Sequence, residues 1–105
     1  MWNTPKEHDL VALPPLYSTE GIPNGDKIIH MHFLLGGFDW YAVEFDGRDT
    51  FFGFITALND PSSAELGYFS LSELRGITLN GQEVDRDLYW NPVPAKDVGI
   101  TATLP

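Results

Sequence analysis

The chain has 105 residues, a formal net charge of −9 and no cysteine, which excludes disulfides, thiol nucleophiles and zinc–thiolate sites. Apolar residues make up 43% of the sequence, without any run of the ~18 that a membrane helix needs, and the N-terminus lacks the basic start of a secretory signal. These properties predict one globular domain over residues 1–105, located in the cytoplasm and with no membrane partner.

The negative charge is spread along the whole chain. Residues 1–50 contain eight acids and three bases, and residues 51–105 contain seven acids and three bases. Direct binding to nucleic acid is disfavoured, because that affinity comes from clustered Lys and Arg. An acidic surface suits a basic protein partner, or imitates a nucleic acid toward one, and the simpler alternative is solubility.

The N-terminal segment carries the signals of a short helix. Thr4 and Glu7 have the spacing of a capping box, with a proline at the first helical position between them. Pro14-Pro15 stops helical structure, so we expect a helix over residues 5–12. Residues 16–20 then run extended.

Consecutive strands are predicted in the centre of the chain. Residues 27–35 alternate apolar and polar side chains, which indicates a strand with one buried face. Gly36-Gly37 is a plausible two-residue hairpin turn. Residues 38–45 are apolar on both faces, which is typical of a strand in the middle of a sheet. The expected faces are Phe38, Trp40 and Ala42 on one side, with Tyr41, Val43 and Phe45 on the other.

Further short elements follow in the second half. A hairpin loop at residues 46–49 leads to a strand over 51–57, and a loop over 59–63 leads to a short strand over 66–69. Ser70 and Glu73 repeat the capping-box pattern and open a single-turn helix that ends at Gly76.

The C-terminal quarter contains a strong turn signal. Asn80-Gly81 between two apolar-containing segments predicts a type I′ hairpin. A last strand is expected over residues 88–90, and residues 95–105 are expected to be peripheral. The predicted fold class is α+β, a small antiparallel β-sheet of about four to six strands with one or two short helices.

Four motifs give the sequence a family resemblance. They are EFDG (44–47), FFGF (51–54), ELGYFSLSEL (65–74) and RDLYW (86–90), preceded by LPPLYSTE (13–20). In this order they resemble the bacterial domain-of-unknown-function 2958 family, over about residues 13–94. The resemblance implies carriage on plasmids, phages and other mobile elements, and it implies no catalytic residue and no cofactor.

Acidic and histidine residues offer a weak metal site. His30 and His32 lie two apart on a predicted strand, so their rings share one face, as in a metal half-site. Glu44 is a third ligand only if the hairpin loop has three residues instead of two. The alternative is a pair of half-buried histidines without a metal, and Asp46-Gly47 is explained by turn chemistry.

A second candidate set is a binding surface. Glu83, Asp85 and Asp87 alternate along an extended segment, which suits an acidic ridge, a cation site or an edge strand protected by charge. Aromatic residues exceed what a small core needs and offer a contact patch, with core packing as the alternative. The predicted binding residues are Asp46, Asp49, Glu83, Asp85, Asp87, Trp40 and Trp90.

The sequence therefore favours a non-enzymatic protein-binding module of a mobile genetic element. The partner expected is another protein. One form of it is a basic nucleic-acid-handling host protein, which would make the chain a counter-defence factor or nucleic-acid mimic. The alternative is a small metal-dependent hydrolase that uses Glu20, Glu44, Asp46 and Glu65 with His30 and His32. At least three of these residues must then converge in one concave pocket.

Overall fold

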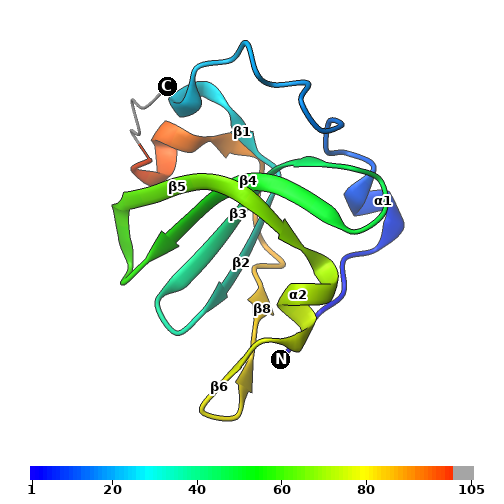
Figure 1. The fold of residues 1–105 in the computed structure, drawn as a ribbon, viewed down its shortest axis with the longest axis vertical. Helices are drawn as coiled ribbons and strands as arrows, with labels where there is room; N and C mark the ends of the chain where they lie inside the picture. Colours follow the sequence, from blue (N-terminus) through cyan, green and yellow to red (C-terminus); the bar gives the residue numbers. More distant parts are fainter. Residues whose placement is uncertain (101–105) are drawn as a thin grey trace.

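The computed structural model describes residues 1–100, and a five-stranded antiparallel sheet forms its centre (Figure 1). The strand order is β5-β4-β3-β2-β8, so the strand that contains Trp40 is the middle one. The predicted fold class is confirmed. The strands are β2 (Met31–Leu35), β3 (Phe38–Phe45), β4 (Thr50–Ala57), β5 (Asp60–Ser70) and β8 (Asp85–Arg86).

One face of this sheet packs against the N-terminal segment and α2. The buried cluster on this face includes Phe33, Phe51 and Leu74, with Trp40 packed against its edge. Helix α1 (Glu7–Leu10) and α2 (Leu71–Gly76) lie on this side, with the small hairpin of β6 (Thr78–Leu79) and β7 (Gln82–Glu83) beyond them.

The opposite face is covered by the segment before β2 and by the C-terminal segment. A two-stranded ladder of β1 (Ile28–Ile29) and β9 (Val93–Pro94) lies over it, beside the 3₁₀ turns η1 (Asn24–Asp26) and η2 (Ala95–Val98). Their buried residues join those of the sheet in a second cluster, which contains Ile29, Val43, Phe54, Ala64, Ala95 and Ile100. The sheet is therefore buried on both faces, as the apolar composition of β3 predicts.

Three local predictions are confirmed. Gly36 and Gly37 both have positive φ and form the two-residue turn between β2 and β3, with Leu35 opposite Phe38. Asn80-Gly81 likewise has positive φ at both residues and joins β6 to β7. The Ser70 hydroxyl accepts a hydrogen bond from the Glu73 N–H at 3.1 Å and caps α2.

A β-bulge in β3 changes which side chains share a face. Ala42 lies opposite Gly53, but Glu44 lies opposite Phe52, so Val43 is an extra residue in the ladder. The bulge directs Val43 and Glu44 toward the same face and returns Phe45 to the face of Ala42, where it joins the first cluster. The expectation that Phe45 shares a face with Val43 is wrong for this reason.

The predicted elements near the two ends need correction. The helix expected over residues 5–12 extends only from Glu7 to Leu10, because Thr4 accepts a hydrogen bond from the Trp2 indole and does not cap the helix. The strand expected over residues 88–90 is absent from the described chain, and β8 pairs with β2 instead. Residues 95–100 are not peripheral, since Ala95 and Ile100 are fully buried; residues 101–105 lie outside the described residues.

Two predicted strands differ in extent. The strand over 27–35 is interrupted at His30, whose N–H bonds to the carbonyl of Ala42. The loop expected over 59–63 is a tight turn at Leu58-Asn59, and β5 begins immediately after it. Pro61 is tolerated there because β5 is an edge strand of the sheet.

Candidate functional site

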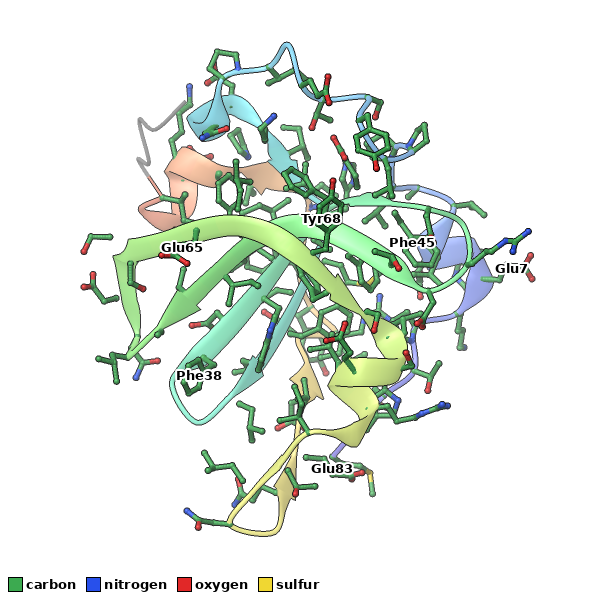
Figure 2. The ribbon with its side chains drawn as sticks, in the orientation of Figure 1. Glu7, Phe38, Phe45, Glu65, Tyr68 and Glu83 are labelled. Atoms are coloured by element: carbon green, nitrogen blue, oxygen red, sulfur yellow. The ribbon has the colours of Figure 1, made fainter. Side chains whose placement is uncertain are left out.

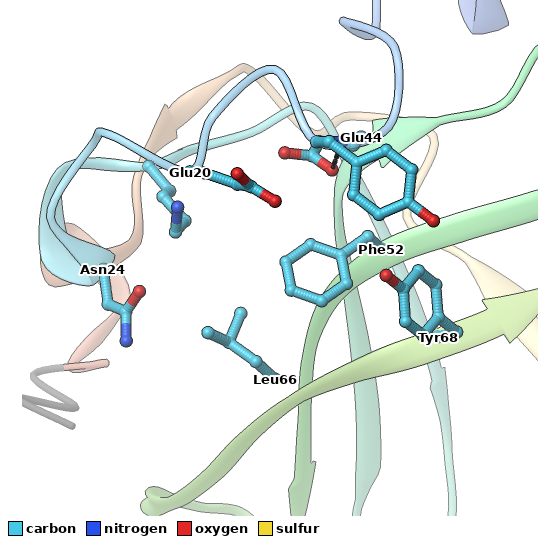
Figure 3. Close-up of a pocket in the computed structure, with 8 residues that line it drawn as sticks. Glu20, Asn24, Glu44, Phe52, Leu66 and Tyr68 are labelled. Carbon is cyan, nitrogen blue, oxygen red and sulfur yellow. Dashed lines mark hydrogen bonds between the residues drawn. The ribbon is translucent and has the colours of Figure 1, made fainter. Parts of the chain in front are cut away.

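A pocket of about 250 Å³ opens beside β4 and β5, on the face of the sheet that carries the second cluster (Figure 3). Strands β3, β4 and β5 each supply part of it, because Glu44, Phe52 and Tyr68 are direct neighbours across the ladder. The segment that precedes β1 closes the other side. The lining residues are Tyr17, Glu20, Asn24, Lys27, Glu44, Phe52, Leu66 and Tyr68.

Glu44 is a buried carboxylate with a full set of donors. One oxygen accepts from the N–H of Tyr17 at 2.8 Å, and the other accepts from the N–H of Thr19 at 3.0 Å and from its hydroxyl. Only 2% of the residue is exposed. Three charge-assisted bonds offset much of the cost of burying this charge, and they tie the 17–19 segment to the central strand.

Tyr17 is held in a conformation that a non-glycine residue rarely adopts. Its φ is 71°, in the left-handed region, and the backbone N–H of this residue is the group that Glu44 binds. Such a residue costs of order 1 kcal/mol or more and persists only where its surroundings fix it. The result is that the Tyr17 ring stands exposed at the pocket, with 63% of the residue accessible to solvent.

Gly53 explains why Glu44 reaches this face. A Cβ atom at Gly53 would lie 1.9 Å from the carbonyl oxygen of Tyr41 and 3.2 Å from the Cα of Ala42. Only glycine therefore allows β3 and β4 to approach this closely next to the bulge. The bulge in turn places Glu44 beside Phe52 in the pocket wall.

Lys27 is the second buried charge of the pocket. Its ammonium group donates to the carbonyl and to the hydroxyl oxygen of Thr19, and the same hydroxyl donates to Glu44. Thr19 therefore bridges a buried cation and a buried anion, whose charges compensate each other.

Two aromatic rings form one wall of the pocket, and two carboxylates lie near them. The rings of Phe52 and Tyr68 are 5.1 Å apart between centroids. A hydrogen bond with Tyr17 raises the pKa of the Tyr68 hydroxyl, and burial and the charges of Glu44 and Glu20 raise it further. Ionisation of the phenol is disfavoured first by the loss of this hydrogen bond and then by burial and by the two nearby carboxylates.

His32 lies in a separate polar cluster on the same face of the sheet. Its Nε2 is 2.7 Å from an oxygen of Asp39, and its Nδ1 is 3.8 Å from an oxygen of Asp87. The ring stacks on Tyr41 at 4.6 Å between centroids and meets Trp90 at 5.0 Å. Burial first, and the charge of Asp39 second, raise the pKa of Tyr41 to about 12.

The predicted H-x-H pair lies at the break between β1 and β2, with His30 at the break and His32 on β2. Glu44, the third ligand considered with this pair, lines the pocket instead. Burial lowers the pKa of His30, which favours the neutral ring. Within residues 1–100, no group of three or more His, Cys, Asp or Glu side chains has a geometry that would hold a metal ion.

Two of the predicted acidic binding residues organise a turn. Asp46 accepts from the N–H groups of Arg48, Asp49 and Thr50; burial opposes this effect, but the three donors lower the pKa of its carboxyl. Asp49 accepts from the N–H and hydroxyl of Ser72 and fastens the turn to α2.

The other three predicted acids are distributed over separate contacts. Glu83 accepts from the N–H of Trp2 at 3.4 Å, and Asp85 pairs with the terminal amine. Asp87 flanks His32. The labelled glutamates Glu7, Glu65 and Glu83 likewise lie at distant points of the molecule (Figure 2).

The two predicted tryptophans belong to the two buried clusters. Trp40 packs against the first cluster, and Trp90 packs against the second, where its indole donates to the carbonyl of Ile29 at 3.0 Å. Both are partly buried, and neither lines the pocket.

Of the six residues of the hydrolase hypothesis, only Glu20 and Glu44 line the same pocket. Tyr17, Lys27 and Leu66 line it without having been predicted as site residues. Lys27 could have been suspected, since it opens an apolar strand at a position that is buried in the fold. Tyr17 carried no such signal, because its role depends on a left-handed backbone that no local motif specifies.

These features define a small antiparallel β-sheet protein with one aromatic-walled pocket built on a bulge. A family described as protein of unknown function, DUF2958, matches residues 21–96, and the chain belongs to this family. The matched range contains six of the eight lining residues; Tyr17 and Glu20 precede it, as does the whole of the LPPLYSTE motif. A search of curated proteins and a search of solved structures each found no match. No helix among residues 1–100 has the length and apolar character to span a membrane.

Proposed function

We propose that the protein is a non-enzymatic binding module that acts in the cytoplasm and whose partner is another protein. The observation that carries the proposal is an exposed group of apolar side chains around a formed pocket, namely Tyr17, Leu66 and Tyr68. Exposed aromatic patches rimmed by polar residues are typical of protein interaction sites.

The rigidity of this patch supports the proposal. Leu66 and Tyr68 stand on β5, and Tyr17 is fixed by the buried Glu44 carboxylate, so the contact surface is ordered before a partner arrives. Order in the free protein reduces the entropy lost on binding. A strained Tyr17 that is kept in place by a buried charge is easier to explain by binding than by folding alone.

Charge favours a basic partner. The chain carries a net charge of −9, which accelerates encounter with positively charged proteins and repels acidic ones. If the protein is carried on a mobile element, a basic host protein that handles nucleic acid would be a suitable partner. This more specific proposal rests on net charge alone, because the acidic residues predicted to bind are engaged in separate local contacts. They are Asp46, Asp49, Glu83, Asp85 and Asp87.

The test is affinity capture with matched aromatic variants. Tyr68→Ala removes an exposed ring from the patch, and Tyr89→Ala removes a more exposed ring outside it. We expect a cellular protein that is retained by the wild type and by Tyr89→Ala, and at least about tenfold less by Tyr68→Ala, as for a central interface aromatic. The same set of proteins on all three baits would contradict the proposal.

A further inference from the structure

We propose that the pocket receives a cationic side chain, the guanidinium of arginine or the ammonium of lysine, from the bound partner. The inference rests on the proposed function, because it names the group that the partner inserts. Its basis is that one charged side chain of the pocket has no partner among the described residues, whereas the other two bind within the pocket wall.

Two of the three charged lining residues are already used. Lys27 and Glu44 both bind Thr19, and their opposite charges compensate each other within the wall. Glu20 is exposed, and within residues 1–100 no hydrogen bond or ion pair engages its carboxylate. The charge of the pocket that is available to a ligand is therefore a single negative one, on the exposed Glu20 side chain.

The walls suit a cation with an apolar stem. Phe52, Tyr68 and Tyr17 present aromatic rings, and a cation over an aromatic face gains ~0.5–2 kcal/mol according to its desolvation. Figure 3 shows the carboxylates of Glu20 and Glu44 on one side, with Phe52, Leu66 and Tyr68 facing them. A lysine or arginine stem would pack on Leu66 while its charged head meets Glu20.

The raised pKa of Tyr68 also supports a positively charged ligand. After the hydrogen bond with Tyr17 and burial, the charges of Glu44 and Glu20 oppose formation of a phenolate there. A potential that disfavours a new anion lowers the free energy of a bound cation. An acidic or neutral partner side chain would gain nothing from this potential.

The experiment uses the full-length ¹⁵N-labelled chain and small probes of known charge. Amide shifts are followed by NMR during titration with N-acetyl-arginine methylamide and N-acetyl-lysine methylamide. The control probe is N-acetyl-citrulline methylamide, which keeps the size and planar shape of arginine but is neutral, with a carbonyl oxygen in place of one NH2 group. We expect saturable shifts confined to residues 17–20, 44, 52 and 66–68, with at least one cationic probe binding about tenfold more tightly than citrulline.

Two variants of exposed acids complete the design. Glu20→Gln is expected to weaken binding of the cationic probe several-fold. Glu65→Gln is the matched control, since Glu65 is an exposed acid on β5 that does not line this pocket, and it is expected to leave binding unchanged. Equal binding of citrulline, equal loss in both variants, or shifts spread over the whole acidic surface would overturn the inference.

The outcome is separable from that of the proposed function. If the probes do not bind but Tyr68→Ala still loses a captured protein, the inference fails and the binding module remains. If the cationic probes bind as expected but no protein distinguishes Tyr68→Ala from Tyr89→Ala, the cation pocket stands and the protein partner does not.

Discussion

Glu44 and His32 are both polar residues of the second-cluster face, and the sheet buries them in different ways. Glu44 is surrounded by N–H and O–H donors from the irregular 17–19 segment, so its burial positions that segment. His32 lies between two carboxylates and two aromatic rings, and one of each, Asp39 and Tyr41, stands on the neighbouring strand β3. The buried carboxylate therefore positions a segment at the surface, whereas the histidine joins side chains around the sheet.

A row of paired residues runs across the sheet between these two sites. His32, Tyr41, Phe54 and Leu66 follow one another across β2, β3, β4 and β5. Phe54 belongs to the buried second cluster, which separates the histidine from the pocket. Changes at one site should consequently leave the other unaltered, unless they alter the sheet itself.

The largest effect is expected from Gly53→Ala. The added methyl group would overlap the Tyr41 carbonyl at the bulge, and we expect a loss of more than about 3 kcal/mol in the free energy of unfolding. Gly67 lies directly opposite Gly53, and a Cβ there would meet only the end of the Ile55 side chain at 3.8 Å. Chemical denaturation should therefore show Gly67→Ala to be mild; equal costs would disprove the role given to Gly53.

The next largest effect is expected from removing one of the two buried charges of the pocket, Glu44 or Lys27. Glu44→Gln leaves the Lys27 cation buried without compensation and replaces an acceptor by an amide, at a cost of about 3 kcal/mol. Lys27→Met should cost less, and the double variant should cost less than the sum by on the order of 1–2 kcal/mol. Strict additivity in denaturation experiments would show that Thr19 does not couple the two charges.

Features set by local residues could be predicted from the sequence, whereas those set by distant residues could not. Gly36-Gly37, Asn80-Gly81 and Ser70 act through their own backbone, and the turns and cap they predict are present. Glu44 depends on a bulge, which shifts the alternation by one residue and cannot be seen in β3 alone. The 13–20 segment is harder still, because its conformation is determined by a carboxylate 25 residues or more away.

A smaller effect is expected at the other polar site. His32→Phe keeps a ring for stacking on Tyr41 but removes the hydrogen bond to Asp39, which should cost ~1–2 kcal/mol. The amide shifts of residues 17–20 should not change, in contrast to Glu44→Gln. NMR spectra in which both variants perturb the pocket equally would remove the distinction between the two sites.

Tyr17 allows strain and contact to be measured separately. Glycine adopts a φ of 71° without a steric penalty, so Tyr17→Gly should be more stable than Tyr17→Ala by on the order of 1 kcal/mol. Both variants lack the ring and should lose partner binding alike. If alanine is tolerated as well as glycine in thermal unfolding, the segment relaxes in solution and Glu44 does not enforce the left-handed conformation.

The smallest effect is a pH dependence of stability that comes from His30, which belongs to neither site. Burial lowers the pKa of His30 in the folded chain, so below a pH of about 6.5 the unfolded state binds a proton that the folded state resists. The corresponding stability is complete above that pH and is lost as the pH falls toward the folded pKa. His30→Gln should therefore lose less stability than the wild type between neutral and mildly acidic pH. Parallel pH profiles of thermal unfolding for the two proteins would show that His30 is accessible to water and that its burial carries no cost.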